Sequence, residues 1–285
     1  MPYRTAFNLL RAPFSPEIEH HALFGCQAFK QCHARLDFLR RERGVAVLTG
    51  EVGSGKTTSL RAFLRQLAPS NYHVLYGAVP NVGAPLRPVV EGWLEEMGER
   101  VPFNNLARCL RTLHQALLAV HEKGRLPFMV LDEAHLLDDR SLLQLKPLLN
   151  YDMDSRLPLA MVLAGGPMLA RRLSFNALEE LRQRLLFVYP MQGLTREELQ
   201  PYLQARLKQA GSDRSLFPAD VVDEIYRHTQ GIPRLVNQLA GLCLVAAATA
   251  RNNQVDSSCL LQALAEMGHG EESRRERLGF ATIAP

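Results

Sequence analysis

The sequence predicts an α/β fold in which a parallel sheet of five strands carries a phosphate-binding loop and is followed by an all-helical domain. Three observations predict this fold. Short, apolar, β-rich segments alternate with helical segments as far as Gly193. A glycine-rich loop joins the first strand to the next helix. After Gly193 the pattern contains helices only, which separates a helical domain from the sheet.

Five segments have the length and composition of strands that are buried on both faces. They are residues 44–50, 73–79, 126–135, 157–166 and 185–191. Helical periodicity predicts the elements between them. These are helices at residues 27–43, 57–66, 86–98 and 105–122, and one that runs from the third strand to Leu149. Because such alternation requires right-handed crossovers, the sheet is expected to be parallel.

The helical region opens with a capping box, Thr195–Glu198, which predicts the start of a helix. Four helices are expected there, at residues 196–210, 218–229, 233–251 and 257–267. The predicted division of the chain is an extended leader (1–20), an α/β nucleotide-binding domain (21–193), a helical domain (194–269) and a flexible tail (270–285).

Composition is that of a globular protein, with 285 residues, 47% hydrophobic and 22% charged. The net charge of +4 does not by itself indicate a polyanionic partner. The sequence lacks a long apolar run and a secretory signal. We therefore expect no membrane segment, and we expect a cytoplasmic location.

Its five cysteines are scattered and form no C-x-x-C pair, which argues against a zinc site or a disulfide framework and predicts reduced, mostly buried thiols.

The loop from Gly50 to Thr57 matches the pattern G-x-x-x-x-G-K-[ST] and lies between a strand and a helix. Its glycines let backbone N–H groups surround a phosphate, Lys56 can reach the β and γ oxygens, and Thr57 can offer a hydroxyl to Mg²⁺. The predicted ligand is therefore ATP with Mg²⁺. The residues expected to contact the nucleotide here are Gly50, Glu51, Val52, Gly53, Ser54, Gly55, Lys56, Thr57 and Thr58.

Two acidic residues end the third strand, in the segment FMVLDEAH. The carboxyl edge of a parallel sheet is where ligands bind, so Asp132 is expected to hold Mg²⁺ and Glu133 to polarise the attacking water. The letters DEAH also occur in helicases. That interpretation is rejected because a helicase needs a second lobe of the same α/β type, and the residues that follow predict a small helical domain.

The segment TQGIPRLVNQLA places Arg234 in the first turn of a helix. A cation there is unfavourable for the helix dipole unless an anion faces it. The γ-phosphate of a bound nucleotide would be such an anion.

Together, the phosphate loop, VLDEAH and GIPRLVN resemble the AAA+ ATPases, and within them the ExeA-like and TnsC-like group. The segments FNLLRAPFSPE, LLNYDMDS, MVLAGGPML and LRQRLLFVYPMQGLTREELQPYLQARLKQAG carry the narrower resemblance, which covers about residues 5–268. It implies that the helical domain is a lid and that Arg234 is its sensor-2 arginine. It also implies that Arg182 or Arg184, and by preference Arg184, reaches the γ-phosphate held by a neighbouring copy.

One position departs from the family pattern. After the fourth strand the sequence reads Ala164-Gly165-Gly166-Pro167, with glycine where relatives tend to carry a polar sensor-1 side chain. The resemblance therefore implies slow, switch-like hydrolysis.

An arginine supplied by a second copy implies an oligomer, either a hexamer-like ring or a helical filament. The leading hypothesis is an ATP-dependent regulator of DNA transposition that assembles on double-stranded DNA and recruits a transposase, with or without a target-selector protein. Candidate DNA contacts are Arg87, Arg108, Arg111 and Lys123.

The alternatives are an ExeA-like ATPase of protein secretion, whose relatives generally continue into a membrane segment, and a scaffold or signalling module that does not bind DNA. The tail is a candidate docking peptide.

Overall fold

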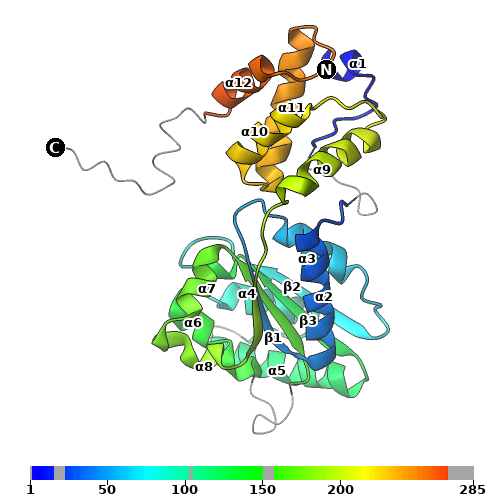
Figure 1. The fold of residues 1–285 in the computed structure, drawn as a ribbon. Coiled ribbons are helices and arrows are strands. Elements are labelled where there is room, and N and C mark those ends of the chain that lie inside the picture. The colour runs from blue at the N-terminus through cyan, green and yellow to red at the C-terminus, as the bar shows by residue number, and fades with distance from the viewer. Residues whose placement is uncertain (1, 16–22, 103–104, 150–156, 269–285) are drawn as a thin grey trace, which may run out of the picture. The chain divides into compact units, whose positions relative to one another are not determined.

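The computed structural model describes residues 2–15, 23–102, 105–149 and 157–268 (Figure 1). The chain divides into two compact units. One comprises Ala28–Gln192, and the other comprises Met1–Gln27 together with Gly193–Pro285.

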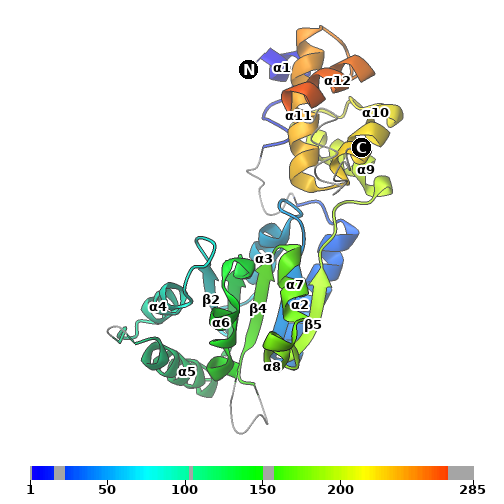
Figure 2. The same cartoon turned by 90° about the vertical axis from the view of Figure 1, so that its left-hand side faces the viewer.

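The first unit is built on one sheet of five parallel strands, as the sequence predicts. The strands are β1 (Gly44–Thr49), β2 (Tyr72–Ala78), β3 (Leu126–Asp132), β4 (Ala160–Gly165) and β5 (Leu185–Pro190). Their order across the sheet is β2-β3-β4-β1-β5, and Figure 2 labels β2, β4 and β5, which follow one another in this order. Three central strands, β1, β3 and β4, are buried along their whole length, which explains their unbroken apolar sequences.

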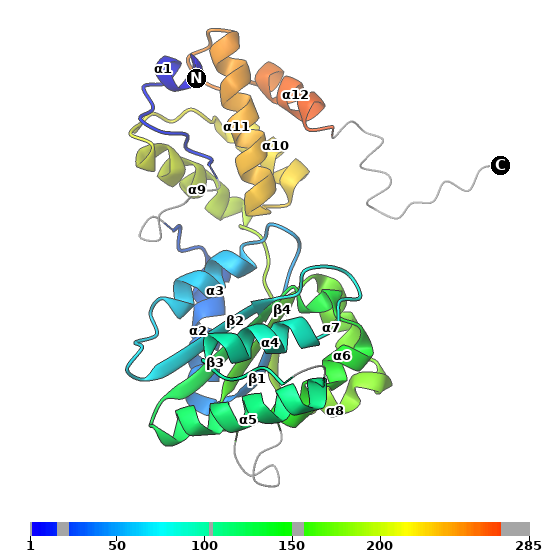
Figure 3. The ribbon, with the colours of Figure 1, turned by 180° about the vertical axis from the view of Figure 1, so that it is seen from behind.

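Helices cover both faces of this sheet. They are α2 (Gln27–Glu42), α3 (Lys56–Leu64), α4 (Arg87–Glu96), α5 (Leu106–Glu122), α6 (Asp139–Leu143), α7 (Pro167–Leu173) and α8 (Glu179–Arg182). Figure 3 shows α4 and α5 in front of the sheet, with α2 and α3 on the opposite face. Alternate residues of β3 point to these two layers. Met129 and Leu131 join the core that contains Trp93 of α4, whereas the Phe128 ring lies 5.6 Å from that of Phe63 on α3.

The segment after the third strand differs from the expected single helix through Leu149. It forms a 3-10 turn at Ala134–Leu136, then α6, then a second 3-10 turn at Lys146–Leu149. Glu133 has a positive φ of 55°, which interrupts any continuous helix. Asp138 then starts α6 anew, because its side chain accepts a hydrogen bond from the backbone N–H of Ser141.

The second unit contains four further helices, close to their predicted positions. They are α9 (Arg196–Gln209), α10 (Ala219–Thr229), α11 (Pro233–Thr249) and α12 (Ser257–Glu266). Thr195 and Glu198 form both hydrogen bonds of the predicted capping box at the start of α9. Leu194 N–H donates to the carbonyl of Gly231 over 2.8 Å. Because the two backbones lie so close together, a Cβ on Gly231 would be 2.0 Å from the carbonyl oxygen of Leu194, so the position requires glycine.

The first residues of the chain are not a separate extended leader. They form a short helix, α1 (Pro2–Ala6), and Phe7 and Leu9 are buried in the core of the helical unit. Leu10 N–H donates to the carbonyl of Ala210, and the buried Arg206 donates to the carbonyl of Ser15. The apolar residues of this segment therefore complete a helical core that would otherwise be open. The expected tail and its docking peptide lie outside the described residues.

The cysteines are reduced; Cys26 is partly exposed, and the other four are buried. Among residues 2–15, 23–102, 105–149 and 157–268, no helix has both the length and the apolar character needed to cross a lipid bilayer.

Candidate nucleotide site

The phosphate loop follows β1 at the carboxyl edge of the sheet, where its sequence predicts it. Gly53 and Gly55 have φ values of +87° and +98°, a region that other residues rarely adopt. A Cβ on Gly50 would lie only 2.5 Å from the carbonyl oxygen of Met191. The backbone path of the loop thus depends on glycine at all three positions.

The lysine of the loop is buried at the start of α3, with only 7% of its surface exposed. Its Nζ donates to the carbonyls of Gly50 (2.8 Å) and Glu51 (3.1 Å). Nearby, the Ser54 hydroxyl is buried without a hydrogen-bond partner among the described residues. An ammonium group, an unpartnered hydroxyl and the N-terminal end of a helix are complementary to a phosphate. The residues present therefore fit the phosphate groups of a nucleotide.

Two segments far apart in the sequence meet beside the loop. Thr57 Oγ1 donates to Asp132 Oδ2 over 2.8 Å, and the carboxylate of Asp132 is almost fully buried. Tyr76, on the neighbouring strand β2, donates its hydroxyl to the same oxygen over 2.9 Å. Burial and the negative charge of Asp132 raise the pKa of Tyr76, which keeps this hydroxyl protonated as a donor.

These oxygens suit a hard cation such as Mg²⁺. In the described part of the chain, no three His, Cys, Asp or Glu side chains cluster closely enough to hold a metal ion. Mg²⁺ at Thr57 and Asp132 would therefore need phosphate oxygens and water as its other ligands.

Glu133 directly follows this carboxylate. Its backbone N–H donates to Asp132 Oδ1 over 2.9 Å, and its positive φ of 55° turns the chain at the strand end. Its side chain is 46% exposed, against 2% for Asp132. The two acids thus occupy different environments, one enclosed beside the loop and one accessible to water.

The arginines expected to act on a neighbouring copy lie at the other end of the sheet. Arg184 precedes β5, whose residue Leu185 pairs with Val45 near the start of β1. The phosphate loop begins after Thr49, so about 13 Å of strand separates the two ends at 3.3 Å per residue. Arg184 can therefore not reach the phosphate site of its own sheet.

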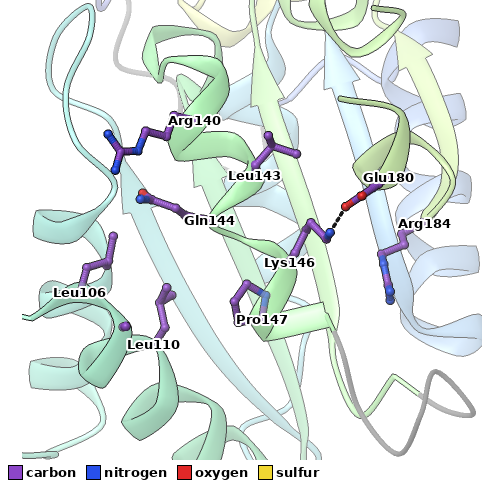
Figure 4. A pocket seen from close by; sticks show the side chains of 10 residues that line it. Leu106, Leu110, Arg140, Leu143, Gln144, Lys146, Pro147, Glu180 and Arg184 are labelled. Atoms are coloured by element: carbon purple, nitrogen blue, oxygen red, sulfur yellow. Dashed lines mark ion pairs between the residues drawn. The ribbon is translucent and has the colours of Figure 1, made fainter. Parts of the chain in front are cut away.

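Arg184 also lines an open groove of about 720 Å³. Its guanidinium donates to the carbonyl of Leu149 over 2.9 Å. In the same groove, Lys146 forms an ion pair with Glu180 (Figure 4). Arg182 is instead paired with Glu179 within α8, with Nε 2.7 Å from Oε2. Arg182 and Arg184 thus have different partners within the chain.

Arg234 lies in the first turn of α11, as predicted, and its side chain is exposed. It belongs to the helical unit, whereas the phosphate loop belongs to the unit of the sheet.

The four candidate DNA contacts do not form one cluster. Arg108 and Arg111 are exposed one turn apart on α5. Lys123 caps the other end of α5, about 22 Å from Arg108 at 1.5 Å per residue. Arg87 lies at the start of α4 and pairs with Glu91, with Nε 2.6 Å from Oε1.

Tyr76 and His135 were missed by the sequence interpretation. Tyr76 reaches Asp132 from β2, and the His135 ring lies against Gly165 and Gly166 after β4. A signal for Tyr76 is present in the sequence, because it is a polar aromatic residue near the carboxyl end of a strand that neighbours the acids. For His135 no local pattern exists, since its contacts depend on how β3 and β4 pair.

The chain is similar to known proteins in sequence and in fold. Residues 39–173 match a family model described as an AAA domain. Over 257 residues the chain is 29% identical to General secretion pathway protein A of Aeromonas hydrophila. That match covers 89% of this chain but 46% of the relative, so the chain spans about half of the relative's length.

Solved structures share the fold at low sequence identity. The Drosophila ORC bound to DNA matches with a TM-score of 0.67 and 20% identity, covering 99% of this chain and 70% of that one. Cdc6p from Pyrobaculum aerophilum matches with a TM-score of 0.66 and 18% identity, covering 89% and 70%.

Proposed function

We propose that this chain, which resembles the ExeA-like AAA+ ATPases, is a slow, switch-like ATPase that assembles with copies of itself on double-stranded DNA. The observation that carries the proposal is the distance between Arg184 and the phosphate loop. They lie at opposite ends of one sheet, so Arg184 can complete only the site of another copy.

Each residue of the site has a role in this proposal. Lys56 would bind the β and γ oxygens, and Thr57 and Asp132 would hold Mg²⁺, which would supply positive charge to neutralise the phosphates. Glu133 accepts a proton from the attacking water. The water oxygen then bonds to the γ-phosphorus, and the bond to the β,γ-bridging oxygen breaks, leaving its electron pair on ADP.

In this arrangement, bound ATP stabilises the interface between two copies. Arg184 of one copy would stabilise the charge on the γ-phosphate held by the next, with Arg234 as a further contact from the helical unit. Hydrolysis would remove the group on which both arginines act and so weaken the assembly. The contacts are head to tail, which leads to a ring or a filament.

DNA binding is supported by two observations. Arg108 and Arg111 are exposed on one helix, and a repeated cation pair in every copy of an assembly would add its contacts to the phosphate backbone. The fold is also shared with a Drosophila ORC structure that is bound to DNA. Recruitment of a transposase is the narrower form of this proposal, and it rests on the resemblance of the sequence alone.

A second candidate is an ATPase of protein secretion. It is favoured by the 29% identity to General secretion pathway protein A. In that case the same nucleotide-dependent assembly is expected, without affinity for DNA.

The test is a gel shift with two unrelated duplexes at low salt, using no nucleotide, ADP or a slowly hydrolysed ATP analogue. We expect a shift only with the analogue, equal for both duplexes and weakened by salt. Lys56→Ala should abolish it, and the double variant Arg108→Glu/Arg111→Glu should weaken it more than Lys123→Glu does. Analogue-dependent assembly in sedimentation without any DNA shift would reject DNA binding and favour the second candidate.

A further inference from the structure

Gly165 at the end of β4 and Gly166 after it leave no side chain at the position where relatives tend to carry a polar one, yet the space is occupied. The imidazole of His135 fills it. A Cβ on Gly165 would lie 3.1 Å from His135 Nδ1, and one on Gly166 would lie 3.5 Å from the ring carbon Cδ2. The backbone N–H of Gly166 donates to His135 Nδ1 over 3.1 Å.

The same ring nitrogen faces the acid that we propose as the proton acceptor. His135 Nδ1 lies 3.3 Å from Glu133 Oε2. The histidine side chain is 24% exposed and the glutamate 46%, so the ring is enclosed on its Gly166 side while the carboxylate faces solvent.

One nitrogen cannot serve both neighbours at once. When the ring proton is on Nε2, Nδ1 accepts from Gly166 N–H; when it is on Nδ1, the ring donates to Glu133. Only the second state, with the proton on Nδ1, holds the Glu133 carboxylate by a hydrogen bond. The ring also joins the end of β4 to this carboxylate, which is the connection that the absent side chain would have made.

The backbone of His135 is fixed independently. Arg172 on α7 donates to the carbonyl of His135 over 2.9 Å and pairs with Asp139, with Nε 2.9 Å from Oδ1. Gly166 precedes the same helix. The backbone of His135 is therefore held through its carbonyl by α7, while its ring packs against Gly166, the residue before that helix.

We propose that His135 is the positioning residue for Glu133 and replaces the missing side chain after β4. This inference rests on the proposed role of Glu133 as proton acceptor. It explains how glycine at residues 165 and 166 is compatible with an oriented catalytic carboxylate, and it makes the geometry of hydrolysis dependent on the packing of α7.

Three substitutions at one position test it. His135→Ala removes the ring; His135→Asn keeps polar atoms where Nδ1 lies, and His135→Gln places them one bond further out. In steady-state hydrolysis at saturating Mg²⁺, we expect kcat to fall about 10- to 100-fold in His135→Ala. KM and the Kd for the ATP analogue should change less than about threefold. His135→Asn should recover most of kcat, and His135→Gln should recover less.

A second variant leaves the histidine itself unsubstituted. Gly165→Ala introduces a Cβ 3.1 Å from both the backbone nitrogen and Nδ1 of His135 and 3.2 Å from Leu169, so it should displace this residue and lower kcat in the same way. Thermal melting identifies any variant that has failed to fold. A His135→Ala protein that keeps kcat within twofold, or an Asn variant no better than the Ala variant, would overturn the inference.

The proposed role of Glu133 can be tested separately from the role of His135. Glu133→Gln should abolish hydrolysis and preserve analogue-dependent DNA binding. If Glu133→Gln still hydrolyses ATP, the role of Glu133 is wrong whatever the histidine variants do. If Glu133→Gln is inactive and His135→Ala is fully active, only the role of the histidine is wrong.

Discussion

Thr57 Oγ1 and Asp132 Oδ2 lie 2.8 Å apart although 75 residues separate them in the chain. The hydroxyl from the phosphate loop and the carboxylate from β3 are thus already together where a Mg²⁺ ion would bind.

Removing the Thr57 hydroxyl should weaken metal-dependent hydrolysis. We expect Thr57→Ala to lower the rate about 10- to 100-fold at limiting Mg²⁺, because one ligand of a hard cation is lost. Thr57→Ser keeps the hydroxyl and is the matched control, expected within a few-fold of the wild type. Measuring the rate against Mg²⁺ concentration checks this. Equal curves for the two variants would contradict a role for the hydroxyl.

Two inactive variants should restore activity when mixed. Lys56→Ala keeps Arg184 but has a defective loop, and Arg184→Ala keeps its loop but supplies no arginine. In a random equal mixture about a quarter of the interfaces combine an intact loop with an intact arginine, so about a quarter of the wild-type rate is expected. Arg182→Ala should be close to wild type when assayed alone. No recovery in the mixture would argue against an arginine supplied by a second copy.

The first residues of the chain should contribute to stability. Phe7 is 1% exposed in the helical core, whereas Leu10 is 79% exposed. We expect Phe7→Ala to destabilise the helical unit by about 3 kcal/mol through the loss of buried area and the cavity left behind. Calorimetry should show its transition at least about 10 °C lower. Leu10→Ala, in the same segment, should leave the transition nearly unchanged.

Asp256 should make stability depend on pH on the acid side. Its side chain accepts hydrogen bonds from the backbone N–H of Cys259 and from Ser258 Oγ. These bonds lower the pKa of Asp256 to about 2. Since the folded-state pKa lies below the unfolded value, its contribution is present above pH 4 and is lost as the pH falls towards 2. Asp256→Asn keeps a capping oxygen without the charge, so its melting temperature should fall less steeply over that range. Parallel curves for the two proteins would contradict this.

The buried thiols should resist modification. Burial raises the pKa of Cys243 to about 12 and also raises that of Cys109. At pH 8 these cysteines remain protonated and therefore poorly nucleophilic. With a disulfide reagent, the folded protein should react rapidly at Cys26 alone, and at all five thiols after unfolding. Rapid reaction at more than one thiol in the folded protein would show that the core is open.

The strands and the phosphate loop could be predicted because their signals are local. Buried strands have continuous apolar sequences, and the loop has its glycines and lysine at fixed spacing. The position of Asp132 followed from the rule that parallel strands end at one edge.

Contacts that depend on three-dimensional pairing could not be predicted. Tyr76 meets Asp132 because β2 lies beside β3, and His135 occupies the space above Gly165 because β3 lies beside β4. The first segment was expected to be an extended leader from its prolines. Its burial against α11 and α9 depends on a core whose shape no short stretch of sequence specifies. The break after β3 was missed because a positive φ at Glu133 is unusual for that residue type.

The placement of Arg184 and the phosphate loop at opposite ends of the sheet gives any row of copies a direction. The first copy would present a loop with no arginine to complete it, and the last an arginine with no loop to act on. The two ends of an open filament would then differ chemically, so growth and loss of copies should proceed at unequal rates at the two ends. On a duplex, such a filament would extend mainly one way.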